Sequence, residues 1–562
     1  MNTSAASTKS RKQTGIRRMI IKLSRKLSIT LTWRPRARVS RLLAMLLAAA
    51  SAPALALPTA GTVGYGTVSE SRTDSTLTVT LDSNKGIIER EGYSVYTGES
   101  VVYKMDPSAT ILERVTGSNP SEIFGSITAS GHFFLINPNG TYFGRDAQVN
   151  VGSLVTSSLD ISNADFIAGR YTFQNGGNAG SVVNQGSLSG KYIALVAPTV
   201  DNSGSINANG GTVALAAGDR VSLDISGDGL MQVSVDAAAA GARINHSGAI
   251  VADGGKVYIT AKSADALMDT VLNVSGLVRA QSLNEQGGVI RLDGGNAGVV
   301  SVSGTLDASG NGGKGGTVTV LGDKVGLFEG AHIDASGNAG GGTVLVGGNY
   351  QGNGPEQNAS MTYVASGASI DASATGNGNG GKVVVWSNEA TRYYGSIAAR
   401  GGAAGGDGGA VEVSGKQNLT YAGSANVGAA NGQVGTVLLD PNDLYVGVAQ
   451  GGATEDMADP FQAMDGNDYY VLAASLAGDA AYTLQANHDV IFNADVAFGS
   501  AGANGVTVTA TNNIQSTGFS ISTAGGALSL NSATMSLGAI NTGAGLLTIN
   551  NSGAATQSGV FA

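Results

Sequence analysis

The sequence contains no cysteine, only four histidines and few aromatic residues, which make up 6% of its 562 residues. Without cysteine, disulfide bonds and thiolate metal sites cannot stabilise the fold. The histidines, His132, His246, His332 and His488, are far apart and share no HxxxH spacing. We therefore predict no metal-dependent catalysis and no bound cofactor.

The sequence after residue 56 also lacks an apolar run of about 18 residues, so no transmembrane helix is predicted there. Residues 1–56 hold 12 of the 32 Lys and Arg and no acidic residue, which leaves 20 basic and 41 acidic residues, a net charge of −21 (20 − 41), for the rest. Neutralising phosphates requires clustered cations. Nucleic-acid binding is therefore not expected.

The basic segment ends in "RLLAMLLAAASAPALA", which is typical of a secretory signal peptide. Arg41 precedes an apolar and small-residue stretch, Leu42–Ala52, which is shorter than the roughly 20 residues of a membrane span. Ala54 and Ala56 form an A-x-A cleavage site. We predict that residues 1–56 are a signal peptide with a long basic n-region and that the processed chain enters the periplasm starting at Leu57.

Glycine is abundant, with 85 residues, and it punctuates a repeat. Each unit has a short strand, a glycine turn and a second β-branched strand, as in "HIDASGNAGGGTVLV" (332–346). The leading aliphatic residues are separated by 44, 28, 28, 27, 37 and 27 positions, and they are Ile206, Ile250, Val278, Leu306, Ile333, Ile370 and Ile397. This period predicts an all-β solenoid with stacked aliphatic side chains. Because a solenoid exposes strand edges at its ends, we expect an N-terminal cap within residues 57–125.

Three aspartates occupy the same repeat position, in the string "DAS": Asp307, Asp334 and Asp371. They could form a carboxylate ladder that binds calcium or acts on sugar, but the favoured interpretation is that each accepts hydrogen bonds from its own turn. Lys314 lies in "GNGGKGG", which lacks the P-loop pattern. No set of carboxylates with a nearby Arg or Lys is nominated for catalysis, so we do not expect an enzyme.

Aromatic residues gather at Trp386, Tyr393 and Tyr394. They could form a platform for a glycan, but packing within the solenoid is favoured. The sequons at Asn358 and Asn418 could accept a glycan, yet they are expected by chance in a chain so rich in Asn, Ser and Thr.

The stretch "SGHFFLINPNGTYFGRDAQVNVGSLV" (130–155) contains a marked turn signal at Asn137, Pro138, Asn139 and Gly140. Pro138 fixes its own φ and biases Asn137 to an extended conformation. Asn139 and Gly140 tolerate positive φ, so a tight turn is predicted.

Three ordered segments, 86–103, 111–162 and 435–446, resemble the filamentous haemagglutinin-like exoproteins of two-partner secretion, in their adhesin-like branch. The resemblance implies a right-handed parallel β-helix and a secretion domain over residues 57–300, recognised by an outer-membrane β-barrel transporter with periplasmic domains. The family's secretion motif falls on Asn137–Gly140, which leaves both a structural turn and a transporter contact open. Where many relatives have an aromatic residue, this chain has Glu89.

The resemblance predicts an exported protein that is secreted or displayed at the cell surface, an adhesin for a receptor or glycan on a host or neighbouring cell. Residues 301–440 are then glycine-rich β-helix repeats, and residues 441–562 are further repeats that we expect to be incomplete at the C-terminus. Two alternatives remain: a β-helical polysaccharide-degrading enzyme, and the stalk of a contact-dependent toxin.

Overall fold

The computed structural model describes residues 57–562 except 178, 226–230, 265–269, 284–286, 450–454, 456–458 and 464–467. The predicted signal peptide and its cleavage site at Ala54 and Ala56 lie outside the described residues. Within the described part of the chain, no helix has both the length and the apolar character needed to cross a membrane.

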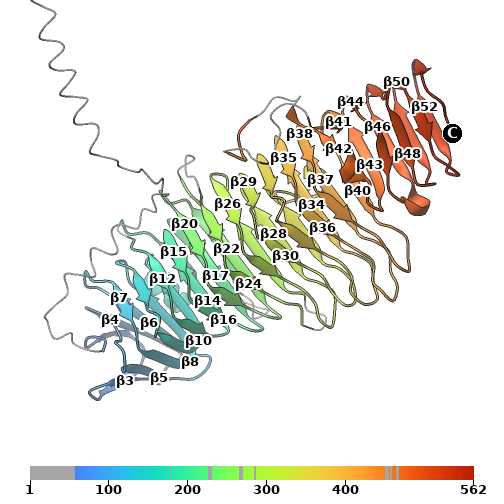
Figure 1. The fold of residues 1–562 in the computed structure, drawn as a ribbon. Coiled ribbons are helices and arrows are strands. Elements are labelled where there is room, and N and C mark those ends of the chain that lie inside the picture. Colours follow the sequence, from blue (N-terminus) through green and yellow to red (C-terminus); the bar gives the residue numbers. More distant parts are fainter. Residues whose placement is uncertain are drawn as a thin grey trace, which may run out of the picture. The chain divides into compact units, whose positions relative to one another are not determined.

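The described chain winds into a stack of coils, and most coils contribute three short strands (Figure 1). One coil contains β27 (Thr305–Asp307), β28 (Thr317–Leu321) and β29 (Lys324–Leu327). These pair in parallel with β30 (His332–Asp334), β31 (Thr343–Val346) and β32 (Met361–Val364) of the next coil. The predicted all-β parallel β-helix is confirmed.

The strands form three faces, and two long strands, β8 (Ser126–Ile136) and β10 (Gln148–Ser157), each contribute to both face 1 and face 2. The other strands of face 1 are β4 (Lys85–Arg90), β6 (Thr110–Val115), β14 (Tyr192–Val196), β17 (Thr212–Ala217), β22 (Lys256–Ala261), β25 (Val289–Asp293), β28, β31, β34 (Lys382–Ser387), β37 (Ala410–Gly415), β40 (Thr436–Leu439), β43 (Ala481–Ala486), β46 (Val506–Ala510), β49 (Leu528–Ser532) and β52 (Leu547–Asn551).

Face 2 has shorter strands, and a separate parallel sheet of three strands follows later in the chain. The strands of face 2 are β3 (Thr76–Leu81), β5 (Ser100–Lys104), β13 (Ser187–Ser189), β16 (Ser205–Asn207), β21 (Ala249–Val251), β24 (Leu277–Arg279), β27, β30, β33 (Ser369–Asp371), β36 (Ser396–Ala398) and β39 (Ser424–Asn426). The separate sheet contains β45 (Val496–Phe498), β48 (Ser520–Thr523) and β51 (Ala539–Asn541).

Face 3 completes the coil. Its strands are β7 (Ser121–Ile123), β9 (Thr141–Phe143), β12 (Val182–Asn184), β15 (Thr199–Asn202), β20 (Arg243–His246), β23 (Leu272–Val274), β26 (Val299–Val302), β29, β32, β35 (Ala390–Tyr393), β38 (Asn418–Tyr421), β41 (Leu444–Gly447), β42 (Val471–Leu472), β44 (Asp489–Phe492), β47 (Asn513–Gln515), β50 (Thr534–Leu537) and β53 (Ala555–Gln557). The short helices are α3 (Asn163–Ala168), η1 (Tyr350–Gly352), η3 (Ala473–Leu476) and η4 (Gly502–Asn504).

Aliphatic side chains point into the coil and stack on their counterparts. Leu306, Ile333 and Ile370 are register partners on β27, β30 and β33, and each is 2% exposed or less. Burying each such side chain contributes about 2 kcal/mol, and a single coil has no second layer to bury it against. Stability therefore comes from the stacking of neighbouring coils.

The N-terminal cap is an antiparallel addition to the first coil. The strand β1 (Thr62–Tyr65) pairs antiparallel with β4, and β2 (Val68–Arg72) pairs antiparallel with β3. From β3 onward the pairing is parallel, as between β3 and β5. The cap therefore lies within the expected segment, 57–125, and occupies only its first part, where it satisfies backbone groups at the edge of the first coil.

The two longest intervals of the repeat mark excursions that the sequence pattern did not describe. Within the first, β18 (Arg220–Asp224) and β19 (Gln232–Ala237) pair antiparallel with each other, and β18 pairs with β11 (Tyr171–Gln174). Together with α3 they cover apolar side chains on the outer surface of face 1. Within the second, residues 347–358 leave the coil between β31 and β32.

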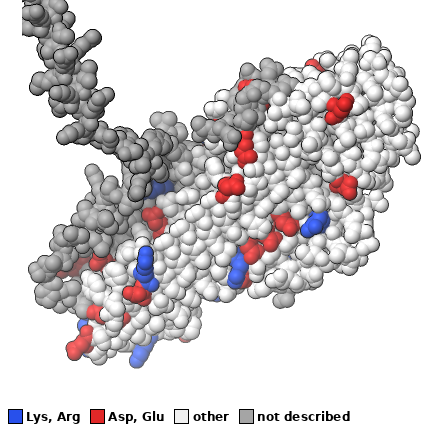
Figure 2. Space-filling view, in the orientation of Figure 1, with Lys and Arg blue, Asp and Glu red and all other residues white. Residues whose placement is uncertain are grey.

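On the face drawn in Figure 2, charged side chains of the described residues are few: several acidic side chains form a short row with basic side chains at its ends, and Lys and Arg form no continuous patch.

Candidate functional site

The predicted turn lies between β8 and β9, at the corner that joins face 1 to face 3. The Gly140 amide donates to the carbonyl of Asn137 at 2.9 Å, which closes a four-residue turn with Pro138 in its second position. Gly140 has φ of 101°, and among the described non-glycine residues only Leu57 and Gln351 have positive φ. The tight turn is thus observed, but positive φ occurs at Gly140 and not at Asn139.

The two asparagine side chains tie this turn to the preceding coil. The Asn137 amide nitrogen donates to the carbonyl of Asn119 and to the Ser121 hydroxyl, both at 3.0 Å. The Asn139 amide nitrogen donates to the carbonyl of Gly117 at 2.8 Å. Asn137 is fully buried, whereas Asn139 is half-buried. Asn137 therefore serves the structure of the corner, and Asn139 retains a surface that a partner can contact.

Close backbone packing explains the glycine. A Cβ added at Gly140 would lie 2.4 Å from the Ser181 carbonyl oxygen, in the next coil. The Thr141 amide donates to that same oxygen at 3.0 Å. The turn therefore contacts the coils on both sides, and these contacts fix its shape.

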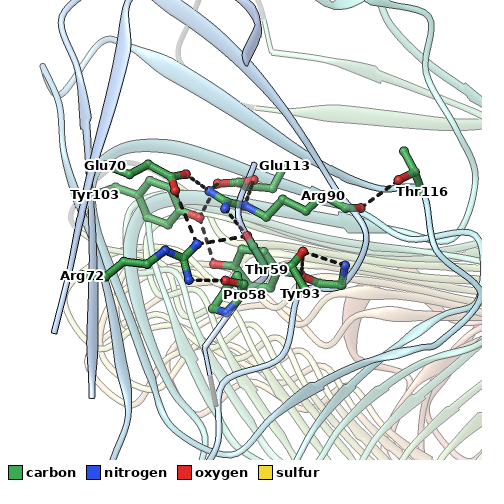
Figure 3. Close-up of polar contacts among 10 residues, drawn as sticks. Pro58, Thr59, Glu70, Arg72, Arg90, Tyr93, Tyr103, Glu113 and Thr116 are labelled. Carbon is green, nitrogen blue, oxygen red and sulfur yellow. Dashed lines mark hydrogen bonds and ion pairs between the residues drawn. The ribbon is translucent and has the colours of Figure 1, made fainter. Parts of the chain in front are cut away.

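A buried ionic network lies next to the cap (Figure 3). Nε of Arg90 donates to Oε2 of Glu113 at 2.7 Å, and both side chains are fully buried. The Tyr103 hydroxyl donates to Oε1 of Glu113 at 2.9 Å, and Tyr93 is 2.9 Å from Tyr103, hydroxyl to hydroxyl. Burial disfavours the charged guanidinium, but the charge and hydrogen bonds of Glu113 outweigh this effect and raise the pKa of Arg90.

This network holds the first described residues of the chain. Arg90 donates to the carbonyl of Thr59 at 2.6 Å, and Arg72 donates to the carbonyl of Pro58 at 2.6 Å. Glu70 accepts from both arginines, so the cap strand β2 joins the same network. The segment just after the predicted cleavage site is thereby fixed to the first coil.

Sequence analysis did not single out Arg90 or Glu113. Both lie in strings that carried the family resemblance, "GIIERE" and "ILERV", each with an acidic and a basic residue directly after two buried aliphatic residues. Because successive side chains of a strand point to opposite faces, one charged side chain of each acidic and basic pair points into the coil. This was the available signal.

The three "DAS" aspartates are stacked in register, Asp307 with Asp334 and Asp334 with Asp371. Each accepts a hydrogen bond from the backbone amide two residues later, at 2.8 to 2.9 Å. The favoured turn role is observed. Within the described residues, no group of three His, Asp or Glu side chains is arranged to hold a metal ion.

The aromatic cluster is buried. Trp386 is 4% exposed and Tyr393 is fully buried, with its ring stacked on Tyr421 at 5.3 Å between centroids. Tyr394 packs against the same core. Tyr393 and Tyr394 thus pack within the solenoid, as favoured from sequence, whereas Trp386 belongs to a separate small apolar cluster with Leu345 and Val384.

The histidines are dispersed. His246 is buried and contacts Asn202 at 2.9 Å (Nδ1 to Nδ2), and Asn202 in turn accepts from Asn184. The structure does not bring His246 together with His132, His332 or His488, each of which lies on a different coil. Of the sequons named from the sequence, Asn358 donates to the carbonyl of Gly352 at 2.8 Å, and Asn418 begins β38.

The chain is similar to known proteins in both sequence and structure. Residues 54–304 match the family model of the TPS secretion domain. The HMW1 secretion domain from Haemophilus influenzae is similar in structure, with a TM-score of 0.59 and 29% identity over 68% of this chain and 99% of that chain.

Two curated heme/hemopexin-binding proteins from Haemophilus influenzae are also similar. One is 25% identical over 247 residues, 42% of this chain and 27% of that protein. The other is 30% identical over 111 residues, 19% of this chain and 12% of that protein. The chain therefore matches only about a quarter or less of the length of these relatives.

The capped stack of parallel coils defines the class of protein as a parallel β-helix. The match over residues 54–304 then identifies a TPS secretion domain in this chain, which supports a two-partner-secretion exoprotein. The resemblance drawn from sequence is confirmed.

Proposed function

We propose that this protein is exported through a dedicated outer-membrane β-barrel transporter and then acts as an adhesin, secreted or held at the cell surface. Two-partner-secretion exoproteins pair with such transporters, and the observation that supports the pairing here is the TPS secretion domain over residues 54–304. The receptor, on a host or neighbouring cell, is part of the proposal. The protein acts by binding and not by catalysis.

The coil structure suits export as an unfolded chain. The sequence has no cysteine, so no cross-link has to be threaded through a pore. Each coil buries aliphatic residues only when it stacks on the coil before it. Folding outside the cell then opposes backward movement of the chain, beginning from the cap and the Arg90–Glu113 network.

Within the secretion domain, Asn139 is the proposed transporter contact. Its side chain is half-buried and lies at an ordered corner, whereas Asn137 is enclosed by the structure.

Export is tested by expressing the chain with its transporter and measuring the amount in the culture medium. Asn139→Ala is compared with Asn426→Ala, a control in another coil corner outside the matched domain, where Asn426 accepts from the Gly428 amide. We expect Asn139→Ala to lower secretion at least several-fold while the purified variant melts within a few degrees of the wild type. Undiminished secretion would remove Asn139 from the recognition surface.

Adhesion is tested separately. Cells that express the chain and its transporter are compared with cells that express the transporter alone, for binding to epithelial cells and to each other. Equal binding by both would reject the adhesin role and leave export intact.

A further inference from the structure

The second long interval of the repeat, 37 residues between Ile333 and Ile370, produces a segment that folds over the outer surface of face 1. We call residues 347–358 the strap. The Gln351 amide donates to Oε2 of Glu412 at 2.9 Å, and its side chain donates to Oδ2 of Asp440 at 3.1 Å. These acceptors lie on later coils, 61 and 89 residues further along the chain. The strap therefore crosses several coils.

The strap is held in a conformation that non-glycine residues rarely adopt. Gln351 has φ of 51°. Such a residue costs about 1 kcal/mol or more and persists where surrounding contacts enforce it. Beneath the strap, Trp386 packs with Leu345 and Val384 in a small apolar cluster on the outer surface. The strap therefore keeps a strained backbone and packs against an outer surface that most coils leave uncovered.

A groove of about 400 Å³ lies between the strap and the strands β34, β37, β40 and β43. Its size is within the range of about 300–1,000 Å³ found for small-ligand pockets. The Tyr350 side chain forms one wall and is 46% exposed. Val384 and Leu438, register partners of Glu412, lie on its floor.

One polar atom in this groove lacks a partner. Glu412 is 1% exposed and lines the groove. Its carboxyl interacts with the Gln351 amide and the Ser414 side chain, but no described residue meets hydrogen-bond geometry at its Oε1. Leaving a buried acceptor unpaired costs about 1–3 kcal/mol, which a bound donor recovers. Thr436, Thr483 and Gln485 add hydroxyl and amide groups along the same groove.

The charges around the groove limit the charge of the ligand that can bind there. Asp440 and Glu412 are acidic and both contact Gln351, whereas Lys382 donates to Asn349 and lies 5.5 Å from the centre of the Tyr350 ring. At a pH above about 7, where Glu412 is ionised, two carboxylates against one ammonium disfavour an anion. The exposed ring of Tyr350, beside the apolar side chains on the floor of the groove, favours a ligand ring that has an apolar face. The unpaired Oε1 of Glu412 favours a ligand that carries hydroxyl donors.

We propose that the groove beside the strap binds a neutral sugar ring of an oligosaccharide, with the ring on Tyr350 and a sugar hydroxyl donating to Glu412. This gives the adhesin role a ligand class, and it rests on that part of the proposed function. Sugars combine apolar ring faces with several hydroxyls, which is the pairing that the groove presents.

The two tryptophans of the chain are Trp33, in the predicted signal peptide, and Trp386, under the strap, so the processed chain carries Trp386 as its single fluorescent reporter. The processed chain is titrated with lactose, cellobiose and chitobiose as neutral probes and with sialyllactose as an acidic probe. We expect a saturable change in emission with at least one neutral probe and at least tenfold weaker binding of sialyllactose.

Binding is then measured by calorimetry for Tyr350→Ala, Glu412→Gln and the control Tyr65→Ala, whose tyrosine is similarly exposed at 44% on β1. Tyr350→Ala is expected to weaken binding at least tenfold and Glu412→Gln several-fold, with the control unchanged. Because Tyr350 is a surface residue, its variant is expected to keep the wild-type melting temperature.

The inference is overturned if no neutral probe binds, or if binding persists unchanged in Tyr350→Ala. Either result leaves the cell-adhesion assay with wild-type chain unaffected, so failure of the sugar site is distinguished from failure of the adhesin role.

Discussion

Arg90 and Glu113, 23 residues apart on β4 and β6, form a fully buried ion pair at 2.7 Å (Nε to Oε2). Two charges removed from water are tolerated only when they are paired and their remaining groups are hydrogen-bonded. Tyr103, Thr59 and Glu70 supply those bonds. The pair thereby links the start of the chain, the cap and the first parallel coil.

Breaking this pair is predicted to destabilise the protein strongly. Arg90→Met leaves Glu113 buried without its partner and should cost about 3–5 kcal/mol of unfolding free energy. Urea denaturation measures this cost. The matched control is Arg170→Met, whose partner Asp165 forms an exposed pair, for which less than about 1 kcal/mol is expected. Equal effects of the two changes would contradict a special role for the buried pair.

Gly140→Ala is predicted to cost more than the same change at another left-handed glycine. Gly140 and Gly98 have φ of 101° and 84°, but only at Gly140 would a Cβ meet a backbone atom, the Ser181 oxygen at 2.4 Å. Gly98→Ala should cost about 1 kcal/mol from φ alone, and Gly140→Ala at least about 2 kcal/mol. Chemical denaturation of both variants checks the difference, and similar costs would argue against close packing at this corner.

His246 is predicted to make the protein less stable in acid. Burial lowers the pKa of His246, so below the unfolded value of about 6.5 the unfolded chain binds a proton that the folded chain does not. Stability is therefore full above that pH and falls as pH decreases. His246→Asn, which can extend the Asn184–Asn202 column, should lose up to about 1.4 kcal/mol less than the wild type between pH 6.5 and 5.5. Thermal melts at the two pH values measure this, and parallel losses would show that another group is responsible.

Glu412 is predicted to have the opposite pH dependence. Burial, reinforced by Asp440, raises the pKa of Glu412 from 4.5 to about 7. Between these values the folded chain holds a proton that the unfolded chain releases, so stability falls as pH rises through this window. Glu412→Gln removes the effect and should be more stable than the wild type at pH 8 by up to about 3 kcal/mol, relative to their difference at pH 4.5.

Denaturation of Glu412→Gln and wild type at pH 4.5 and 8 checks this prediction. The control is Glu122→Gln, a half-buried carboxyl on β7. A constant difference between wild type and Glu412→Gln at both pH values would show that Glu412 ionises normally.

The sequence by itself determined the repeat. Stacked coils can be predicted from two sequence features: glycine turns between β-branched strands, and a period of 27 to 28 residues at positions such as Leu306 and Ile333. These features suffice because each strand faces the same environment in every coil. The turn at Asn137–Gly140 was also predictable from the sequence, because the backbone preferences of its residues are local.

Only the tertiary structure decided which residues from distant coils meet. The Arg90–Glu113 pair, the Asn139 bond to Gly117, and the strap that carries Gln351 to Glu412 and Asp440 all join residues whose separation in sequence has no period. An insertion shows in the sequence as a longer interval, but its length does not specify the surface that it will cover. That surface depends on the exposed apolar and acidic side chains of neighbouring coils, and these are brought together only when the coils have stacked.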